Sequence, residues 1–185
     1  MKQIRTQIFE TNSSSSHSLN FRKKDPKLNY AGLDEYVKKD KKLHMKFGQF
    51  GWGYDEYEDA YNKLSYLLTM IIETKKATFC RSGITSLDEY YNLDEFILVE
   101  AIITEHVKDC TGIIIDSKVE FNPYDDPEID INNKSRGYVS HDGYIDHQSC
   151  EYYGCLDDFL NDYETDIENF IFDENIQLII DNDNH

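Results

Sequence analysis

The chain has 185 residues, of which 24 are Phe or Tyr, and a formal net charge of −17. This length fits one domain of about 100–200 residues, which can bury a core without a metal or a disulfide. No apolar run approaches the roughly 18 residues of a membrane span, and no apolar segment follows the first residues as in a secretory signal. We therefore expect one cytoplasmic domain over residues 1–185, with no membrane partner and with reduced cysteines.

The charge is distributed unevenly along the chain. Residues 1–50 form a basic part with a net charge of +6, and residues 51–185 form an acidic remainder with a net charge of −23. Such asymmetry indicates a charged partner. The alternative is a solvated acidic surface that keeps the protein soluble.

The first part of the chain alternates between strand and loop patterns. Residues 3–9 alternate as a strand does, the polar run 10–18 is typical of a loop, and residues 19–21 resume as a strand. Residues 33–42 predict a short basic helix with Leu33, Tyr36 and Val37 inward. Three glycines between aromatic residues make 47–54 a turn-rich loop.

Three amphipathic helices are expected further on. The first follows a cap at Asp55, has apolar residues at helical spacing over 60–72, and ends near Lys75 and Lys76. Ser86 and Asn92 each precede a Glu by three residues, as at a helix start, and the helix after Asn92 ends at Gly112. The third helix buries one face. Its residues are Leu156, Phe159, Leu160, Tyr163, Ile167, Phe170 and Ile171.

The remaining segments predict strands and one surface excursion. Residues 113–115 and 119–121 are strand-like, the acidic stretch 122–136 with two prolines is expected at the surface, and 176–180 is a closing strand. This order favours an α+β fold, in which a small mixed or antiparallel sheet packs with about three amphipathic helices.

The serine-rich run from Thr11 to Ser18 is the first candidate site. Hydroxyl groups and free backbone N–H groups in a loop can hold a phosphate, and an imidazole can move protons near neutral pH. We assign Asn12, Ser13 and Ser14 to ligand binding, and Ser16 and His17 to catalysis. The alternative is a loop whose hydroxyls satisfy its own backbone.

The second candidate is the stretch from His141 to Cys150. Asp146 can orient His147 for proton transfer, and Gln148 and Ser149 can bind a ligand. A zinc site with His141, His147, Cys150 and Cys155 would have a spacing that matches no standard structural site. We therefore assign no metal and no cofactor; a polar surface loop remains the alternative.

The aromatic loop is the third candidate. Exposed Phe50, Trp52 and Tyr54 can stack on bases or on a partner protein, and we assign Trp52 to ligand binding. The alternative is that these rings turn inward and fill an edge of the core. His44, His106 and His185 show no pattern, and Cys80 and Cys110 are expected to be small apolar residues.

The segment from Ile8 to Ser18, Ile-Phe-Glu-Thr-Asn-Ser-Ser-Ser-Ser-His-Ser, resembles the N-terminus of small, mostly uncharacterised bacterial and bacteriophage proteins. The stretches 47–52 and 145–149 also resemble segments of this group, so that the likeness covers about one seventh of the chain. Some of these proteins resemble anti-CRISPR inhibitors of Cas9-type systems. The resemblance implies one shared site, in which the serine loop and the Asp146–Ser149 stretch converge.

The resemblance implies a phage or mobile-element protein, in a bacterial host cell, that inhibits a nucleic-acid-directed defence system. Its partner would be a host defence protein or ribonucleoprotein, such as Cas9 with its guide RNA. Inhibition can work by acidic nucleic-acid mimicry or by cleavage or modification of bound RNA with His17 and His147. The alternatives are a small cytoplasmic enzyme acting on a nucleotide or phosphoester, and a non-catalytic acidic binding module.

Overall fold

The computed structural model describes residues 2–4, 15–23, 25–51, 54–78, 82–123, 137–145 and 156–182; of residues 2–4, 15–17, 181 and 182 it describes the backbone. Runs of strands and runs of helices follow one another along the chain, and the main sheet is small and antiparallel. The expected α+β class is confirmed. Beside the main sheet, the described segments form three separate strand pairs, two of them parallel.

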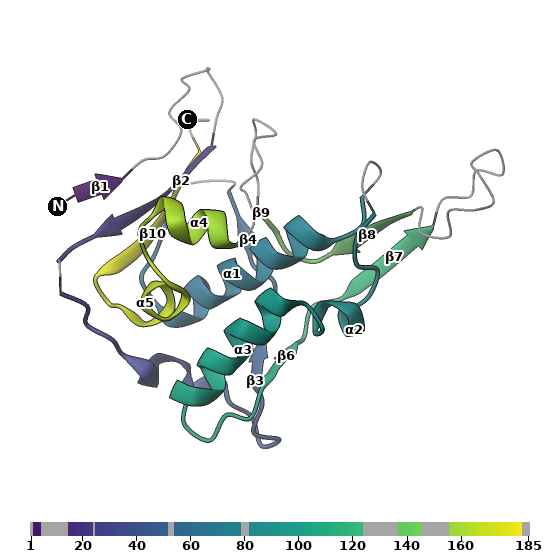
Figure 1. The fold of residues 1–185 in the computed structure, drawn as a ribbon, viewed down its shortest axis with the longest axis horizontal. Coiled ribbons are helices and arrows are strands. Elements are labelled where there is room, and N and C mark those ends of the chain that lie inside the picture. Colours follow the sequence, from purple (N-terminus) through teal and green to yellow (C-terminus); the bar gives the residue numbers. More distant parts are fainter. Residues whose placement is uncertain are drawn as a thin grey trace.

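The main sheet joins the two ends of the chain (Figure 1). Its order is β1 (Lys2–Ile4), β2 (Ser15–Phe21), β10 (Ile176–Asn182) and β5 (Asp55–Tyr57), and every neighbouring pair is antiparallel. The expected closing strand is thus an inner strand. In its register Leu178 lies opposite Leu19 on one side and Tyr57 on the other, and both leucines are fully buried.

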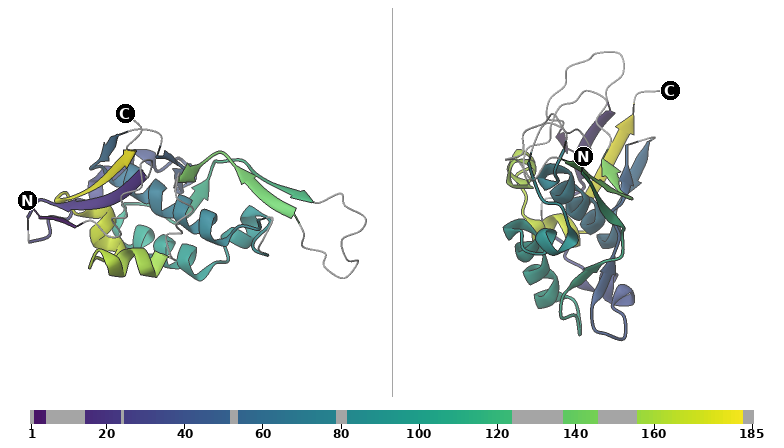
Figure 2. Two further views of the ribbon diagram at one scale, coloured as in Figure 1. Left: turned by 90° about the horizontal axis from the view of Figure 1, so that it is seen from above. Right: turned by 90° about the vertical axis from the view of Figure 1, so that its right-hand side faces the viewer.

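Helix α1 (Ala60–Lys75) runs through the middle of the molecule, with the main sheet on one side and α3 (Asp94–His106), α4 (Leu156–Asp162) and α5 (Ile167–Phe172) on the other (Figure 2). The expected apolar face is buried, and burial extends to Tyr66 and Met70 on the neighbouring faces. The predicted cap was wrong: Asp59, not Asp55, accepts the Asn62 N–H at 2.8 Å. Asp55 lies in β5, because the chain forms a strand before it enters the helix.

A buried lysine ties α1 to the start of β10. The Lys63 side chain is enclosed, and its Nζ donates to the carbonyl oxygens of Asp173 at 3.0 Å and Ile176 at 3.3 Å. Burial disfavours the charged amine and lowers the pKa of Lys63 to about 8, against a smaller opposing effect of Asp173.

The helices α2 (Leu87–Tyr90) and α3 (Asp94–His106) follow the expected starts in part. Ser86 caps α2 by accepting the Glu89 N–H, as predicted. Asn92 does not cap α3, which begins after Leu93 without a side-chain cap; the Asn92 side chain donates to the Asp88 carbonyl instead. The helix also ends at His106, six residues before Gly112, which adopts a φ of +152° in the following turn.

The third expected helix is two helices, α4 (Leu156–Asp162) and α5 (Ile167–Phe172). All seven predicted apolar residues are buried, so that the predicted face is confirmed. The continuous helix was wrong, because Glu164 takes a left-handed φ of 51° and Asp166 starts a new helix by accepting the Asn169 N–H at 2.7 Å.

The region between β2 and α1 also differs from expectation. A 3₁₀ helix, η1 (Tyr30–Tyr36), replaces the helix predicted over 33–42, and Val37 instead pairs with Leu43. Leu33 is fully buried, as predicted. Strand β3 (Leu43–Met45) then pairs in parallel with β6 (Ile113–Ile115), which confirms the predicted strand at 113–115.

A two-stranded hairpin projects from the end of the molecule opposite the main sheet (Figure 2). It consists of β7 (Val119–Pro123), which confirms and extends the predicted strand, and β8 (Gly137–His141). Its base is joined to the C-terminal end of α1 by the hydrogen bond from Val139 N–H to the Ala77 carbonyl at 2.9 Å. In the part of the chain that is described, no helix is long and apolar enough to cross a bilayer.

Candidate functional site

Most residues of the predicted composite site lie outside the part of the chain that the structure describes. Asn12, Ser13, Ser14, Trp52 and the stretch Asp146–Ser149 lie outside the described residues, as do the side chains of Ser16 and His17. Convergence of these residues therefore stays a prediction. The backbone corrects one point: Ser15–Ser18 belong to β2 rather than to a loop, with Ser16 opposite Asp181 and His17 opposite Ile180.

Of the three rings that the sequence suggested as exposed, Phe50 instead packs in the core, as the alternative interpretation expected. Phe47 is 4% exposed and Phe50 is 2% exposed, and the Phe50 ring meets Tyr57 and Tyr66 edge to face. Residues Gln49–Phe50 form β4, which pairs in parallel with β9 (Tyr144–Ile145). Phe50 is therefore not the exposed stacking ring that the sequence suggested, whereas Tyr54 is half exposed.

His141 was expected in a polar surface loop, and it is instead the last residue of β8 with a side chain that is 1% exposed. Its Nε2 lies 3.0 Å from Glu73 Oε1, and Lys76 Nζ lies 2.8 Å from Glu73 Oε2. Burial acts to raise the pKa of Glu73, but the hydrogen bonds from His141 and Lys76 outweigh it and lower this pKa. The cluster fastens the hairpin base to α1, and its buried ring is closed to a substrate.

The zinc alternative finds no support in the described segments, where no group of three or more His, Cys, Asp or Glu side chains is arranged to hold a metal. His147, Cys150 and Cys155 lie outside these segments. Among the residues that the structure describes, none forms a hydrogen bond with the buried Nδ1 of His141.

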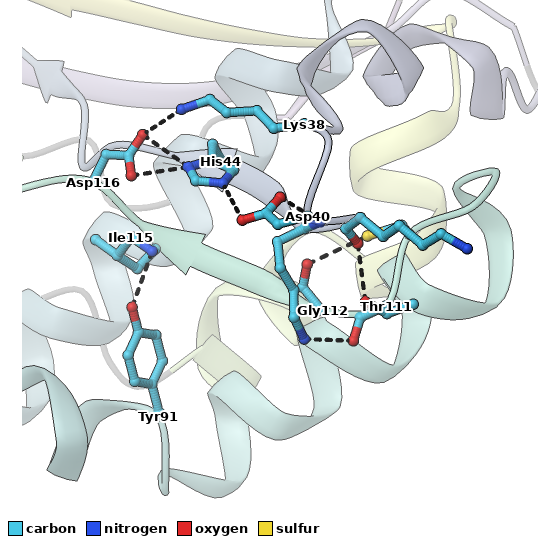
Figure 3. A network of polar contacts seen from close by, with 11 residues as sticks. Lys38, Asp40, His44, Tyr91, Thr111, Gly112, Ile115 and Asp116 are labelled. Carbon is cyan, nitrogen blue, oxygen red and sulfur yellow. Dashed lines mark hydrogen bonds and ion pairs between the residues drawn. The ribbon is translucent and has the colours of Figure 1, made fainter.

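A network of charged side chains surrounds His44, a residue that the sequence did not single out (Figure 3). His44 Nδ1 lies 3.0 Å from Asp116 Oδ1, and His44 Nε2 lies 3.0 Å from Asp40 Oδ2. Lys38 Nζ lies 3.1 Å from the other oxygen of Asp116. Hydrogen bonds to Asp40 first, and then to Asp116, raise the pKa of His44, which favours the imidazolium form.

This geometry suits a structural contact better than catalysis. The two carboxylates lie at opposite edges of the ring, and they therefore cannot bind one metal ion together with His44. Both ring nitrogens already have carboxylate partners, so that proton transfer to a substrate would first have to break one of these pairs. The network joins the turn at 38–42 to the end of β6.

His106 is engaged in a similar way. Its ring stacks on Tyr30 with centroids 4.5 Å apart, and its Nε2 lies 3.2 Å from Glu168 Oε1, which also accepts the Tyr30 hydroxyl at 2.6 Å. The hydrogen bond to Glu168, and burial after it, raise the pKa of Tyr30 to about 12. Each histidine side chain that the structure describes is thus paired with a carboxylate.

The feature that remains available to a partner is the charge of the helical layer. Residues 82–107 and 156–182 carry six and nine carboxylates, respectively, and contain no Lys or Arg. These ranges include α2 to α5, which lie on the side of α1 away from the main sheet (Figure 2). We call their exposed carboxylates the acidic helical face. Its residues are Asp88, Glu89, Asp94, Glu105, Asp157, Asp158, Asp162, Glu164 and Asp166.

Basic residues from outside the two ranges neutralise some of the other carboxylates. Lys75 pairs with Glu95, and Lys27 pairs with Glu174. The first pair is partly buried and the second is more exposed, and both reduce the local charge. The sequence analysis did not predict the acidic helical face, although a count of charged residues for each expected helix would have indicated it.

Comparisons of the chain with protein-family models, with curated proteins and with solved structures find no match. The functional argument therefore depends on the chain's own residues.

Proposed function

We propose that the protein is an acidic inhibitor that occupies a basic, nucleic-acid-binding surface of a host defence protein of the Cas9 type. The observation that carries the proposal is the acidic helical face, which belongs to two ranges without a single Lys or Arg. The N-terminal motif, which resembles those of phage and bacterial proteins, supports the same class of target.

The physical basis of the proposal is competition for positive charge. Duplex DNA presents about one negative charge per 1.7 Å along its axis, and proteins bind it with Lys and Arg. Cas9-type proteins hold the guide–target duplex in a positively charged channel. A rigid surface rich in carboxylates can enter such a channel, and steering by opposite charges speeds the encounter. Carboxylates pair with His44, His106 and His141, so that the proposal assigns no catalytic role to these three residues.

A cleavage assay with Cas9, guide RNA and target DNA tests the proposal. We expect the protein to reduce DNA binding in a mobility-shift measurement, and we expect this inhibition to weaken as salt increases. Replacing Asp157, Asp162 and Glu164 by their amides should weaken inhibition about tenfold. The matched control replaces Asp25, Asp34 and Glu35, which are exposed outside the acidic helical face, and should change inhibition less than threefold.

Two results would count against this proposal. Equal losses in both triple variants, or no inhibition at all, would remove the acidic helical face as the contact. A guide RNA that is shortened on a denaturing gel would show that the protein acts by cleavage, which would return attention to His17 and His147.

A further inference from the structure

The outward side of α3 carries a stripe of apolar side chains. Ile97 and Leu98 are each 50% exposed, and Ala101 on the next turn is also exposed. Ala101 follows Ile97 by four positions and Leu98 by three, and it therefore adjoins both on the helix surface. The opposite side of α3 packs into the core through Phe96, Val99 and Ile103. The helix therefore has a second apolar stripe that the fold does not cover.

Carboxylates stand at both ends of the stripe. Asp94 precedes Ile97 and Leu98 by three and four positions, and Glu105 follows Ala101 by four, so that both continue the same stripe. Both are exposed. Asp94 and Glu105 are eleven positions apart, which corresponds to about 16 Å along the helix axis. An apolar centre between two charges is the arrangement of a binding surface with a water-excluding core and a polar rim.

The charges decide which occupant fits. If two copies of the chain packed along this stripe, a parallel arrangement would place Asp94 against Asp94 and an antiparallel one would place Asp94 against Glu105. Either way, like charges would meet at both ends, in a protein with a net charge of −17. The complementary occupant is an apolar segment with a positive charge at each end.

We propose that the α3 stripe binds an amphipathic helix of a partner protein, through Ile97, Leu98 and Ala101, with Asp94 and Glu105 each receiving a Lys or Arg of that helix. This inference rests on the proposed function, because it takes the partner to be basic, and it adds the contact by which one acidic protein would select among basic surfaces. Charge alone attracts any cationic surface, whereas the stripe requires apolar side chains between correctly spaced charges.

Two synthetic helical peptides with identical Leu, Ala, Gln and Lys composition provide the test. In the first, lysines flank the apolar face eleven positions apart; in the second, the same lysines lie next to each other on the polar face. Fluorescence anisotropy with the full chain should show that the first peptide binds about tenfold more tightly. Equal affinities would overturn the inference.

Variants locate the contact. The double change Ile97→Ser and Leu98→Ser should lower affinity for the first peptide about tenfold at every salt concentration, since it removes half-exposed apolar area. The change Asp94→Asn with Glu105→Gln should lower it at low salt and flatten its salt dependence. The charge-matched control, Asp34→Asn with Glu35→Gln, lies outside the acidic helical face and should have less than a twofold effect. An unchanged affinity in the Ile97/Leu98 variant would overturn the inference.

The test also separates this inference from the function on which it rests. Inhibition of Cas9 that survives the Ile97/Leu98 variant would overturn the α3 contact and leave the acidic inhibitor standing. Selective binding of the first peptide without Cas9 inhibition would support the stripe and remove the proposed target. Sedimentation equilibrium completes the set: a dimer of the wild-type chain that the Ile97/Leu98 variant dissociates would assign the stripe to a second copy and overturn the inference.

Discussion

At the scale of single residues, His44 shows where sequence analysis reaches its limit. Asp40 is four residues away and visible as a neighbour, whereas Asp116 is separated by 72 residues and arrives through the parallel pairing of β3 with β6. The pairing of two strands so far apart in the sequence cannot be predicted from the residues near either strand. The buried Lys63 is similar, because its partners are carbonyl oxygens more than 100 positions along the chain.

The His44 network makes a pH-dependent contribution to stability. Because Asp40 and Asp116 raise the pKa of His44, the pairs contribute fully below the unfolded-state pKa of about 6.5 and are lost as pH rises through the higher folded-state pKa. We expect His44→Gln to lower the free energy of unfolding by about 1 kcal/mol near pH 6 and by clearly less near pH 9. Urea unfolding at both pH values measures this.

The control for His44 is Lys38→Gln. This change removes the Lys38–Asp116 pair and leaves both carboxylates on the imidazole. Its cost should change less between the two pH values than that of His44→Gln, because the Lys38–Asp116 pair is a direct contact that does not include the imidazole. A His44→Gln effect that is constant with pH would mean that the ring contributes by packing rather than by charge.

At the scale of elements, apolar spacing predicted burial better than it predicted helix ends. The apolar residues between Leu156 and Ile171 follow a helical period and are buried. The helix nevertheless ends at Asp162, and a new one begins at Ile167. The apolar spacing does not reveal this interruption, because α5 places its apolar side chains toward the same core as α4. The signal that was available is Thr165-Asp166, a capping residue within the presumed helix.

The cap at Asp166 provides the prediction for this element. Its carboxylate accepts the Asn169 N–H at 2.7 Å and also receives the Asn169 side chain at 2.7 Å. We expect Asp166→Ala to lower the free energy of unfolding by about 1 kcal/mol, because an N–H at the start of α5 loses its acceptor. Thermal unfolding measures this, and Asp162→Ala in the last turn of α4 is the control.

A loss at Asp162 as large as that at Asp166 would contradict the capping argument. Removing a carboxylate near the C-terminal end of α4 should be neutral or slightly stabilising, since the helix dipole disfavours negative charge there. The pair therefore distinguishes a lost cap from a general effect of reduced charge.

At the scale of the whole molecule, the sequence showed how much charge each part of the chain carries, but it did not show where the fold places this charge on the surface. The division into a basic part over 1–50 and an acidic remainder follows from the sequence alone. The fold then gathers α2 to α5 on one side of α1, which brings ranges that are about fifty residues apart into one layer (Figure 2). The exposed Ile97 and Leu98 had a sequence signal as well, since they lie off the face that Phe96, Val99 and Ile103 form at helical spacing and that the structure buries.

Repulsion within the acidic helical face should make the protein's stability depend on salt. Screening length falls from about 30 Å at 0.01 M to about 3 Å at 1 M ionic strength, which weakens repulsion between carboxylates more than it weakens the close, partly buried pairs. We therefore expect the midpoint of thermal unfolding to rise by several degrees between 0.01 and 0.5 M sodium chloride.

The Asp157→Asn, Asp162→Asn and Glu164→Gln variant should show a higher midpoint than the wild type at low salt and a smaller rise with salt. The control triple variant, at Asp25, Asp34 and Glu35, lies among the basic residues of the first part of the chain and should lower the midpoint or leave it unchanged. If both variants were stabilised equally, net charge alone would govern the response. Stabilisation confined to the first variant would show that local crowding of carboxylates costs folding free energy, as expected for a surface kept for a basic partner.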